Sequence, residues 1–385
     1  LQKRISRTRQ EGGVNMLSRE RLEKTFLDMV RVYSPSKNEA AMVTWLEHYL
    51  TSRHIEYKKD NAGAAYGGNG CNLVAYIPGT LKGMPIGFMA HTDVIEPCDN
   101  ILPVKEGNLI KTDGTTTLDG DKKDGITTIL EALEDNIESK KEHRDIYLGF
   151  SCSEELSMMG TKNMDLSILP CKDLIIPDGT GEAGIIAYKA PAMYAIKMTF
   201  IGKKAHAGIE PEKGINAIVV ASKAISKMHI GRMDAETTAN LGEIKGGAAT
   251  NVVTDLVTVT AEIRAHDMDK LESEKIHMEN CCREAAKEMG ADYKFECELA
   301  YPSLSVDPKG PLVQITKNAM EAVGVTPDLR VIGGGSDANV LAASGYRSVI
   351  LGTGMIDVHT VNEAMDMDEL FKVTKVMNYI MSSND

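Results

Sequence analysis

The sequence reads IYLGFSCSEE at residues 146–155 and LIIPDG at residues 174–179. Each segment begins with an apolar run that has the length and composition of a short buried strand. The first run leads into Ser153-Glu154-Glu155, and the second ends in Pro177-Asp178-Gly179. Because open α/β sheets bind their ligands beyond the carboxyl ends of the strands, we expect these acids to lie in a functional site.

Two further buried elements lead to residues of the same chemical kind. The apolar strand predicted for Ile86 to Ala90 delivers His91-Thr92-Asp93, and Asp121 precedes a strongly periodic helix predicted from Gly125 to Ile137. The positive potential at a helix N-terminus favours an ionised carboxylate. With a histidine near the end of the chain, these residues form a set suited to a pair of zinc-like ions: His91, Asp121, Glu155, Asp178 and His359.

The residue types also suggest which role each residue has in such a site. Asp121 suits the bridge between the ions, His91 and Asp178 could complete one ion, and Glu155 and His359 could complete the other. Glu154 is then left to act as general base and to carry the proton to the leaving amine. Asp93 is placed to orient the imidazole of His91. Each residue alone has an ordinary explanation as a surface charge; their shared position after buried runs favours a metal site.

Bulk properties narrow the class of protein. The chain has 385 residues, enough for two domains, and a formal charge of −12, which disfavours a nucleic-acid partner. No apolar run is long enough to span a bilayer, so no membrane partner is expected. Seven scattered cysteines without a CxxC pair favour a reducing, cytoplasmic location. We expect residues 1–15, which are basic and polar, to be a disordered extension.

The element pattern predicts an α/β catalytic domain with a mixed central sheet flanked by helices, interrupted by a smaller domain. The catalytic domain takes residues 16–189 and 301–385. Residues 190–300 carry alternating strands and two periodic helices in the order β-α-β-β-α-β, which predicts a ferredoxin-like α+β lid. Its exposed strands make dimerisation through the lid an expectation.

Several segments, in order, resemble the di-zinc peptidase family that contains peptidase T, certain carboxypeptidases, aminoacylases and desuccinylases. The resemblance extends from about Leu17 to the end of the chain. The AHAG and GGGSDAN segments point towards the peptidase T-like branch. The matching segments are MAHTD (89–93), LDGDKKDG (118–125), SEE (153–155), PDG (177–179), AHAG (205–208), GGSDAN (334–339) and His359-Thr360.

The resemblance implies roles for residues outside the metal site. His206, in the lid, would donate a hydrogen bond to the developing oxyanion. Asn251 and Arg264 would hold the carboxylate of a small peptide substrate, although alone they suggest a strand-end turn and a surface ion pair. Gly335 and Asn339 are further candidates for substrate binding, because the glycine-rich turn would bring the backbone close to the substrate. The cofactors implied are two zinc ions, with cobalt or manganese as replacements.

One residue departs from the family pattern. Relatives usually carry a second aspartate after the bridging one, whereas here Lys122 follows Asp121 and the next aspartate is Asp124. An ammonium group close to two cations would weaken metal binding, unless Lys122 points into solvent.

We therefore predict a zinc-dependent peptidase that acts on small peptides in the manner of a tripeptide aminopeptidase. The alternative within the enzymes is an N-acyl-amino-acid amidohydrolase that uses the same two metals. An inactive binding homologue, suggested only by Lys122, and a single-metal structural site remain less favoured explanations.

Overall fold

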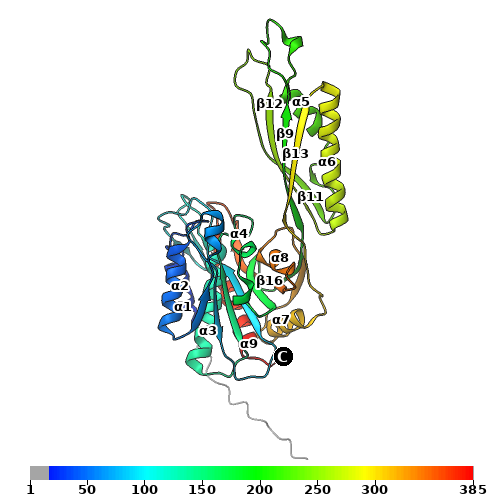
Figure 1. Cartoon of the computed structure of the whole chain (residues 1–385). Coiled ribbons are helices and arrows are strands. Elements are labelled where there is room, and N and C mark those ends of the chain that lie inside the picture. Colours follow the sequence, from blue (N-terminus) through cyan, green and yellow to red (C-terminus); the bar gives the residue numbers. More distant parts are fainter. Residues whose placement is uncertain (1–16, 385) are drawn as a thin grey trace, which may run out of the picture. The chain divides into compact units, whose positions relative to one another are not determined.

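The computed structural model describes residues 17–384, which form two compact units (Figure 1). Unit 1 comprises the described residues up to Ala187, Asp307–Leu329 and the residues from Tyr346 onward. Unit 2 comprises Tyr188–Val306 and Arg330–Gly345. The extension predicted for residues 1–15 lies outside the described residues.

The second part of unit 2, residues 330–345, differs from the predicted arrangement, which assigned it to the catalytic domain. Hydrogen bonds explain why this segment belongs to unit 2. The backbone N–H of Ile332 donates to the carbonyl of Lys189, and the side chain of Asn339 donates to the carbonyls of Pro191 and Pro302. This segment is therefore bound to the two chain passages that begin and end the main part of unit 2.

The main sheet of unit 1 is mixed, as the sequence predicted. Its strands follow the order β1-β2-β6-β3-β7-β16-β17-β5-β4. The pairs β6–β3, β3–β7 and β7–β16 are parallel, so the carboxyl ends of four neighbouring strands share one edge. The strand bounds are β1 Glu56–Lys59, β2 Leu73–Ile77, β3 Ile86–His91, β4 Val104–Glu106, β5 Leu109–Lys111, β6 Ile146–Ser151, β7 Asp173–Thr180, β16 Arg347–Ile356 and β17 Ala364–Asp366.

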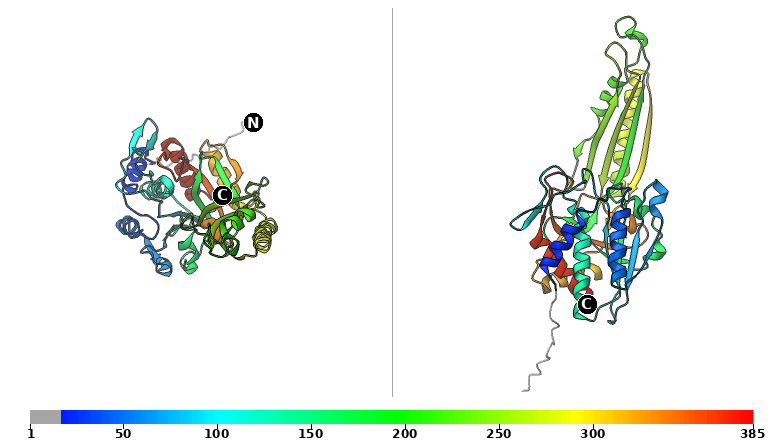
Figure 2. Two further views of the ribbon diagram at one scale, coloured as in Figure 1. Left: turned by 90° about the horizontal axis from the view of Figure 1, so that it is seen from above. Right: turned by 90° about the vertical axis from the view of Figure 1, so that its left-hand side faces the viewer.

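Helices cover this sheet. The periodic apolar positions predicted for Gly125 to Ile137 lie in α3, which packs beside α9 and α1 and against β3 and β7 (Figure 2). Residues Asp121 and Lys122, at the start of α3, do not have helical backbone angles, so the regular helix begins after them. The helix bounds are α1 Arg19–Met29, α2 Ala40–Ser52, α3 Gly120–Ser139, α4 Met159–Lys162, α7 Pro311–Ala322 and α9 Met367–Ser382.

Unit 2 contains an antiparallel sheet in the order β10-β11-β12-β9-β13. Helices α5 and α6 contact each other and the sheet, and together they enclose an apolar core. Apart from the short β10, the element order is the predicted β-α-β-β-α-β. The bounds are β9 Ala192–Ile201, α5 Ala217–Ile225, β10 Gly231–Arg232, β11 Thr237–Gly246, β12 Leu256–Ala265, α6 Met268–Met289, β13 Asp292–Tyr301 and α8 Asp337–Ala342.

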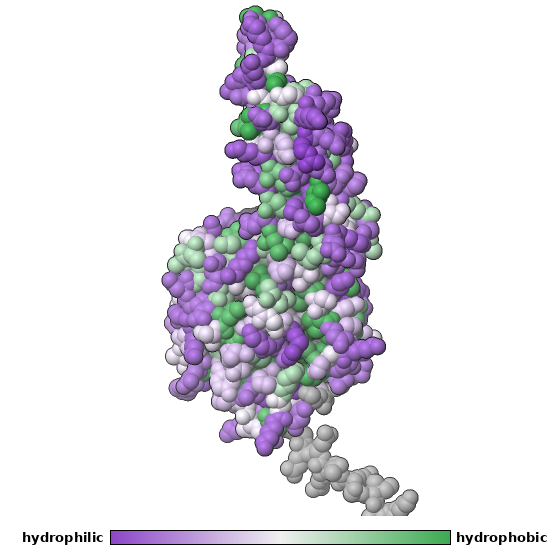
Figure 3. All heavy atoms as spheres, turned by 45° about the vertical axis from the view of Figure 1, so that its right-hand side comes forward, coloured by the Kyte–Doolittle hydropathy of each residue, from purple (hydrophilic) through white to green (hydrophobic). Residues whose placement is uncertain are grey.

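The outer surface of unit 2 is mostly hydrophilic on the face drawn in Figure 3, with single apolar residues between polar ones. On the sheet, polar side chains lie opposite each other, as in the pair formed by Lys197 and Glu296. This is the solvent-exposed face that the alternation of apolar and polar residues predicted. Three short strands lie where the chain passes from one unit to the other: β8 Ile185–Ala190, β14 Leu304–Ser305 and β15 Asp328–Val331.

Within residues 17–384, we find no helix with both the length and the apolar composition needed to cross a bilayer.

Candidate metal centre

The shared edge of the four parallel strands collects the predicted ligands, all of which belong to unit 1. His91 is the last residue of β3, and Asp178 lies near the end of β7. Glu155 follows β6, and His359 lies in the turn between β16 and β17. Asp121 joins them from the irregular start of α3. Thus the sheet topology brings together five residues that are far apart in sequence.

Asp121, Glu155 and His359 form the first ligand group, which we call the open group. His359 Nε2 lies 3.0 Å from Asp121 Oδ2 and 3.1 Å from Glu155 Oε1. Hydrogen bonds with these two carboxylates raise the pKa of His359 to about 10. One ligand atom from each residue lies within 4.8 Å of the others, a spacing that could hold a single ion.

His91, Asp121 and Asp178 form a second group with the same spacing. We call it the lysine group, because the Lys122 ammonium lies inside it. Lys122 Nζ is 2.9 Å from Asp121 Oδ1, forms an ion pair with the Asp178 carboxylate, and donates to the Asp178 carbonyl at 3.3 Å. His91 Nε2 lies 3.8 Å from Asp121 Oδ1.

The orientation of Lys122 answers the question that the sequence raised. Only 1% of Lys122 is exposed, so its side chain does not point into solvent. Burial by itself would lower the pKa of Lys122, but the surrounding carboxylates, Asp121 first among them, raise it. The ammonium is thus held in its charged form beside the carboxylates that an ion at the lysine group would need.

Asp93 contacts both His91 and the segment that carries Glu154 and Glu155. His91 Nδ1 lies 2.8 Å from the Asp93 carbonyl and 3.2 Å from its carboxylate, which directs Nε2 towards the ligand groups. The same carboxylate accepts the backbone N–H groups of Glu154 at 2.8 Å and Glu155 at 3.1 Å. Burial would raise the pKa of Asp93, but the hydrogen bond with His91 and its charge lower it.

Glu154 lies beside the ligand groups. Its Oε2 is 3.7 Å from His91 Nε2, and its side chain is almost fully buried. Together with His91 and Glu155 it forms a third group with metal-ligand spacing, so its carboxylate reaches the region between the ligands. That position is within reach of a water molecule held at the centre, as a general base requires.

Residues that the sequence did not single out support the centre. Ser36 donates to the Asp93 carboxylate at 2.7 Å, and Glu39 accepts from the backbone N–H of Ser153 at 2.9 Å. Glu363 accepts the backbone N–H of Asp121 at 3.0 Å, and burial raises the pKa of Glu363 to about 7. No spacing or motif in one sequence marks these residues, because their partners are more than fifty positions away.

The other predicted residues belong to unit 2. His206 is exposed, and its Nδ1 accepts the backbone N–H of Gly208 at 3.2 Å, so Nε2 carries the proton of the neutral ring. Asn251 is also exposed. The guanidinium of Arg264 pairs with the Glu262 carboxylate through two N–H groups, at 2.9 and 3.1 Å.

The geometry of Gly335 and Asn339 indicates structural roles, and their part in substrate binding stays a prediction. The amide of Asn339 is buried, accepts from the backbone of Ser336 and donates to two proline carbonyls, so its hydrogen-bonding groups are used inside unit 2. A Cβ at Gly335 would lie 2.4 Å from the Tyr301 ring, which explains the glycine by close packing.

The donor set fits divalent transition-metal ions. Each group offers one imidazole and two carboxylates, which are the ligands of catalytic zinc sites. At the open group an ion must displace the proton of His359, whereas at the lysine group it must displace the whole Lys122 ammonium.

Comparison with known proteins agrees with this arrangement. Residues 192–290 match the peptidase dimerisation domain of the M20 family. The chain is 37% identical over 362 residues to the uncharacterised protein YqjE of Bacillus subtilis, covering 94% of this chain and 98% of that one. The crystal structure of aminopeptidase PepT from Bacillus cereus is 36% identical, with a TM-score of 0.88 over 95% of this chain and 99% of that one. A tripeptidase from Staphylococcus aureus is 31% identical, with a TM-score of 0.92 over 95% and 98%.

Proposed function

Because this chain belongs to the peptidase T-like branch of the M20 peptidases, and is therefore a hydrolase, we propose that it is a zinc-dependent exopeptidase that acts on small peptides, tripeptides above all. The observation that carries the proposal is the convergence of Asp121, Glu155 and His359 beside Glu154, at the carboxyl edge of the parallel strands.

Two zinc ions would be held at this centre, one by the open group and one by the lysine group, with Asp121 shared. Zinc supplies a polarised scissile carbonyl and a water molecule of lowered pKa when it is bound. We expect the open group to bind first and more tightly, since only the lysine group contains an ammonium.

The chain's own residues would then manage the proton and the orientation of the ligands. Glu154 would take a proton from the attacking water and give it to the leaving amine. Asp93 would support this role in two ways, since it fixes the ring of His91 and the backbone of Glu154.

Unit 2 would contribute substrate contacts. The protonated Nε2 of His206 is suited to donate to an oxyanion. Asn251 and Arg264 remain our proposals for binding the substrate's carboxylate; Arg264 would then share its guanidinium between that carboxylate and Glu262. Since unit 2 carries the match to the dimerisation domain, we also propose a homodimer formed through this unit.

We propose a cytoplasmic location as well. All seven cysteines are free, and burial is the main cause that raises the pKa of each thiol, which suits thiols that stay reduced.

The direct test is the Glu154→Gln variant, assayed on a tripeptide panel beside its zinc content. We expect turnover to fall by at least about 10²-fold, as for the loss of a general base, with zinc retained. Glu142→Gln, at an exposed position in the same unit, is the matched control and should behave like the wild type. Substantial turnover in the Glu154 variant would overturn the assignment of the base.

The substrate panel should include N-acyl amino acids. Cleavage of these compounds without peptide cleavage would replace the peptidase by an amidohydrolase. Failure to retain zinc at all would favour an inactive homologue, for which Lys122 is the structural reason.

A further inference from the structure

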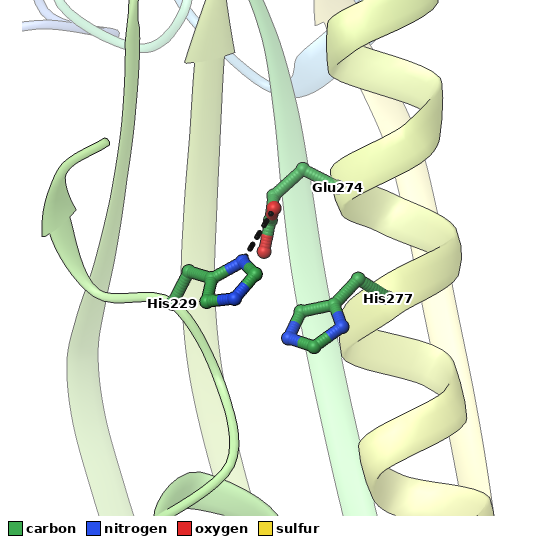
Figure 4. Close-up of side chains that lie close together, drawn as sticks. All are labelled: His229, Glu274 and His277. Atoms are coloured by element: carbon green, nitrogen blue, oxygen red, sulfur yellow. Dashed lines mark hydrogen bonds and ion pairs between the residues drawn. The ribbon is translucent and has the colours of Figure 1, made fainter. Parts of the chain in front are cut away.

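Unit 2 contains a second cluster of metal-ligand side chains, separate in sequence from the centre described above. His229 lies in the connection between α5 and β10, and Glu274 and His277 lie one turn apart on α6. One ligand atom of each residue lies within 4.8 Å of the others. Figure 4 shows the Glu274 carboxylate above the two imidazole rings, between α6 and the segment that carries His229.

The two imidazole rings are held face to face. Their centroids are 4.0 Å apart and their planes differ by 12°. Because the lone pairs of an imidazole lie in the plane of its ring, one ring must turn before both can bind one ion, and His229 is the exposed ring of the two-segment cluster. The His229–Glu274 contact, at 3.1 Å between Nδ1 and Oε2, fixes one side of the cluster.

Hydrogen-bond partners indicate which ring nitrogens are available as ligands. His277 Nε2 lies 3.1 Å from the carbonyl of Lys227, which can only accept, so this nitrogen donates and Nδ1 keeps its lone pair. His229 Nδ1 is the nitrogen that faces the Glu274 carboxylate, so an ion held by both residues would take the place of a proton on this nitrogen. The ring N–H that His277 donates to a carbonyl is an arrangement typical of metal-binding histidines.

Glu274 supplies an independent observation. Only 8% of the residue is exposed, and its Oε1 is buried without a hydrogen-bond partner in the structure. Buried carboxylate oxygens are normally paired, so this atom calls for a cation or donor. His229, by contrast, has a side chain that is 59% exposed. His229 and Glu274 both line a surface hollow of about 750 Å³, which gives an ion a path to the cluster.

We propose that His229, Glu274 and His277 form a transition-metal site in unit 2 that takes zinc or an ion of similar preference. Two imidazoles and a carboxylate are a donor set that zinc uses, with the remaining position open to water from the hollow. Since the three ligands come from two separate segments, a bound ion fastens the α5–β10 connection to the middle of α6. The site is distinct from the proposed catalytic centre and is a stabilising site of unit 2.

The test is cobalt and zinc titration of the full-length, metal-stripped chain, with metal counted per chain and the visible spectrum of cobalt recorded. His229→Ala and His277→Ala should each bind one ion fewer than the wild type, or bind it at least tenfold more weakly. His48→Ala, an exposed histidine of unit 1 outside every ligand group, is the matched control and should bind as the wild type does.

A third variant separates this site from the centre in unit 1. Asp121→Asn removes the ligand shared by both groups there and should still bind the unit 2 ion and show its cobalt spectrum. Zinc should also raise the melting temperature of Asp121→Asn, and His229→Ala in the same background should abolish that rise. Equal metal content and equal affinity in the wild type and both histidine variants, each folded by circular dichroism, would overturn the proposal.

Discussion

The open group and the lysine group contain the same kinds of ligand but differ in their surroundings. Each has one histidine and two carboxylates, and they share Asp121. The His359 side chain of the open group is 48% exposed, whereas that of His91 in the lysine group is 2% exposed. Only the lysine group holds a buried ammonium. Ligand types therefore determine which ion can bind, and neighbouring charge determines how readily each group accepts it.

The difference follows from the cost of burying charge. Carboxylates removed from water need a compensating cation nearby. At the lysine group Lys122 supplies this cation, and its whole ammonium must move to admit a metal ion. At the open group the partner of the carboxylates is His359, which needs to lose only a proton to become a ligand.

The largest effect should come from the residue that both groups share. Asp121→Asn removes the bridging charge and should release both ions of the centre. Because metal ions contribute several kcal/mol to catalysis, turnover should fall by about 10³-fold or more. Metal analysis beside a tripeptide assay checks this, with Asp99→Asn, at an exposed position, as control. Loss of a single ion would show that Asp121 does not bridge.

A substitution outside both ligand groups should leave the metal affinities of the two groups unchanged. His206→Ala removes the proposed oxyanion donor, so kcat should fall by about 10²- to 10³-fold, the cost of losing such a donor. Zinc content and the affinities of both groups should stay as in the wild type. A change in metal content would place His206 among the ligands instead.

The histidines of the two groups can be compared directly. Loss of a residue that hydrogen-bonds to a metal ligand lowers metal affinity about 10- to 100-fold. Loss of the ligand itself should therefore lower metal affinity by at least as much. His359→Ala should weaken the tighter of two zinc-binding steps, and His91→Ala the weaker one. Calorimetric titration of the stripped protein distinguishes them, and the reverse assignment would contradict our ranking of the groups.

The smallest effect on turnover should come from the lysine itself. Lys122→Met keeps most of the unbranched side chain and removes the charged Nζ. Unit charges 4 Å apart interact by about 4 kcal/mol in a protein-like medium, so the weaker zinc-binding step should tighten on the order of tenfold or more. Lys172→Met, in the same unit, is the control. An unchanged weaker step would mean that Lys122 moves out of the site at no cost.

The sequence predicted those parts of the molecule that depend on local patterns. Alternation marked β9 and β12 as strands with one wet face, and helical periodicity marked α3 and α6. The candidate metal ligands could be selected from the sequence because most follow an apolar run and Asp121 precedes a periodic helix, and because the carboxyl ends of parallel strands meet at one edge. The positions of the ligands thus followed from strand order and residue type.

Side-chain direction and long-range partners could not be predicted in the same way. Lys122 is adjacent to Asp121 in sequence, yet no pattern indicates that its ammonium points inward. Asn339 hydrogen-bonds to the carbonyls of Pro191 and Pro302, which are distant in sequence, and no pattern around the glycine-rich segment indicates these partners. Glu363 supports Asp121 across more than two hundred residues.

The measurement that tests the central claim most directly is a zinc titration of metal-stripped protein in which bound zinc and tripeptide hydrolysis are followed on the same sample. We predict negligible hydrolysis without metal, two zinc-binding steps of different affinity at the centre, and hydrolysis that rises with their occupancy. The unit 2 ion is counted separately with His229→Ala. Hydrolysis that persists after the metal is removed, or that does not follow zinc binding, would contradict the account.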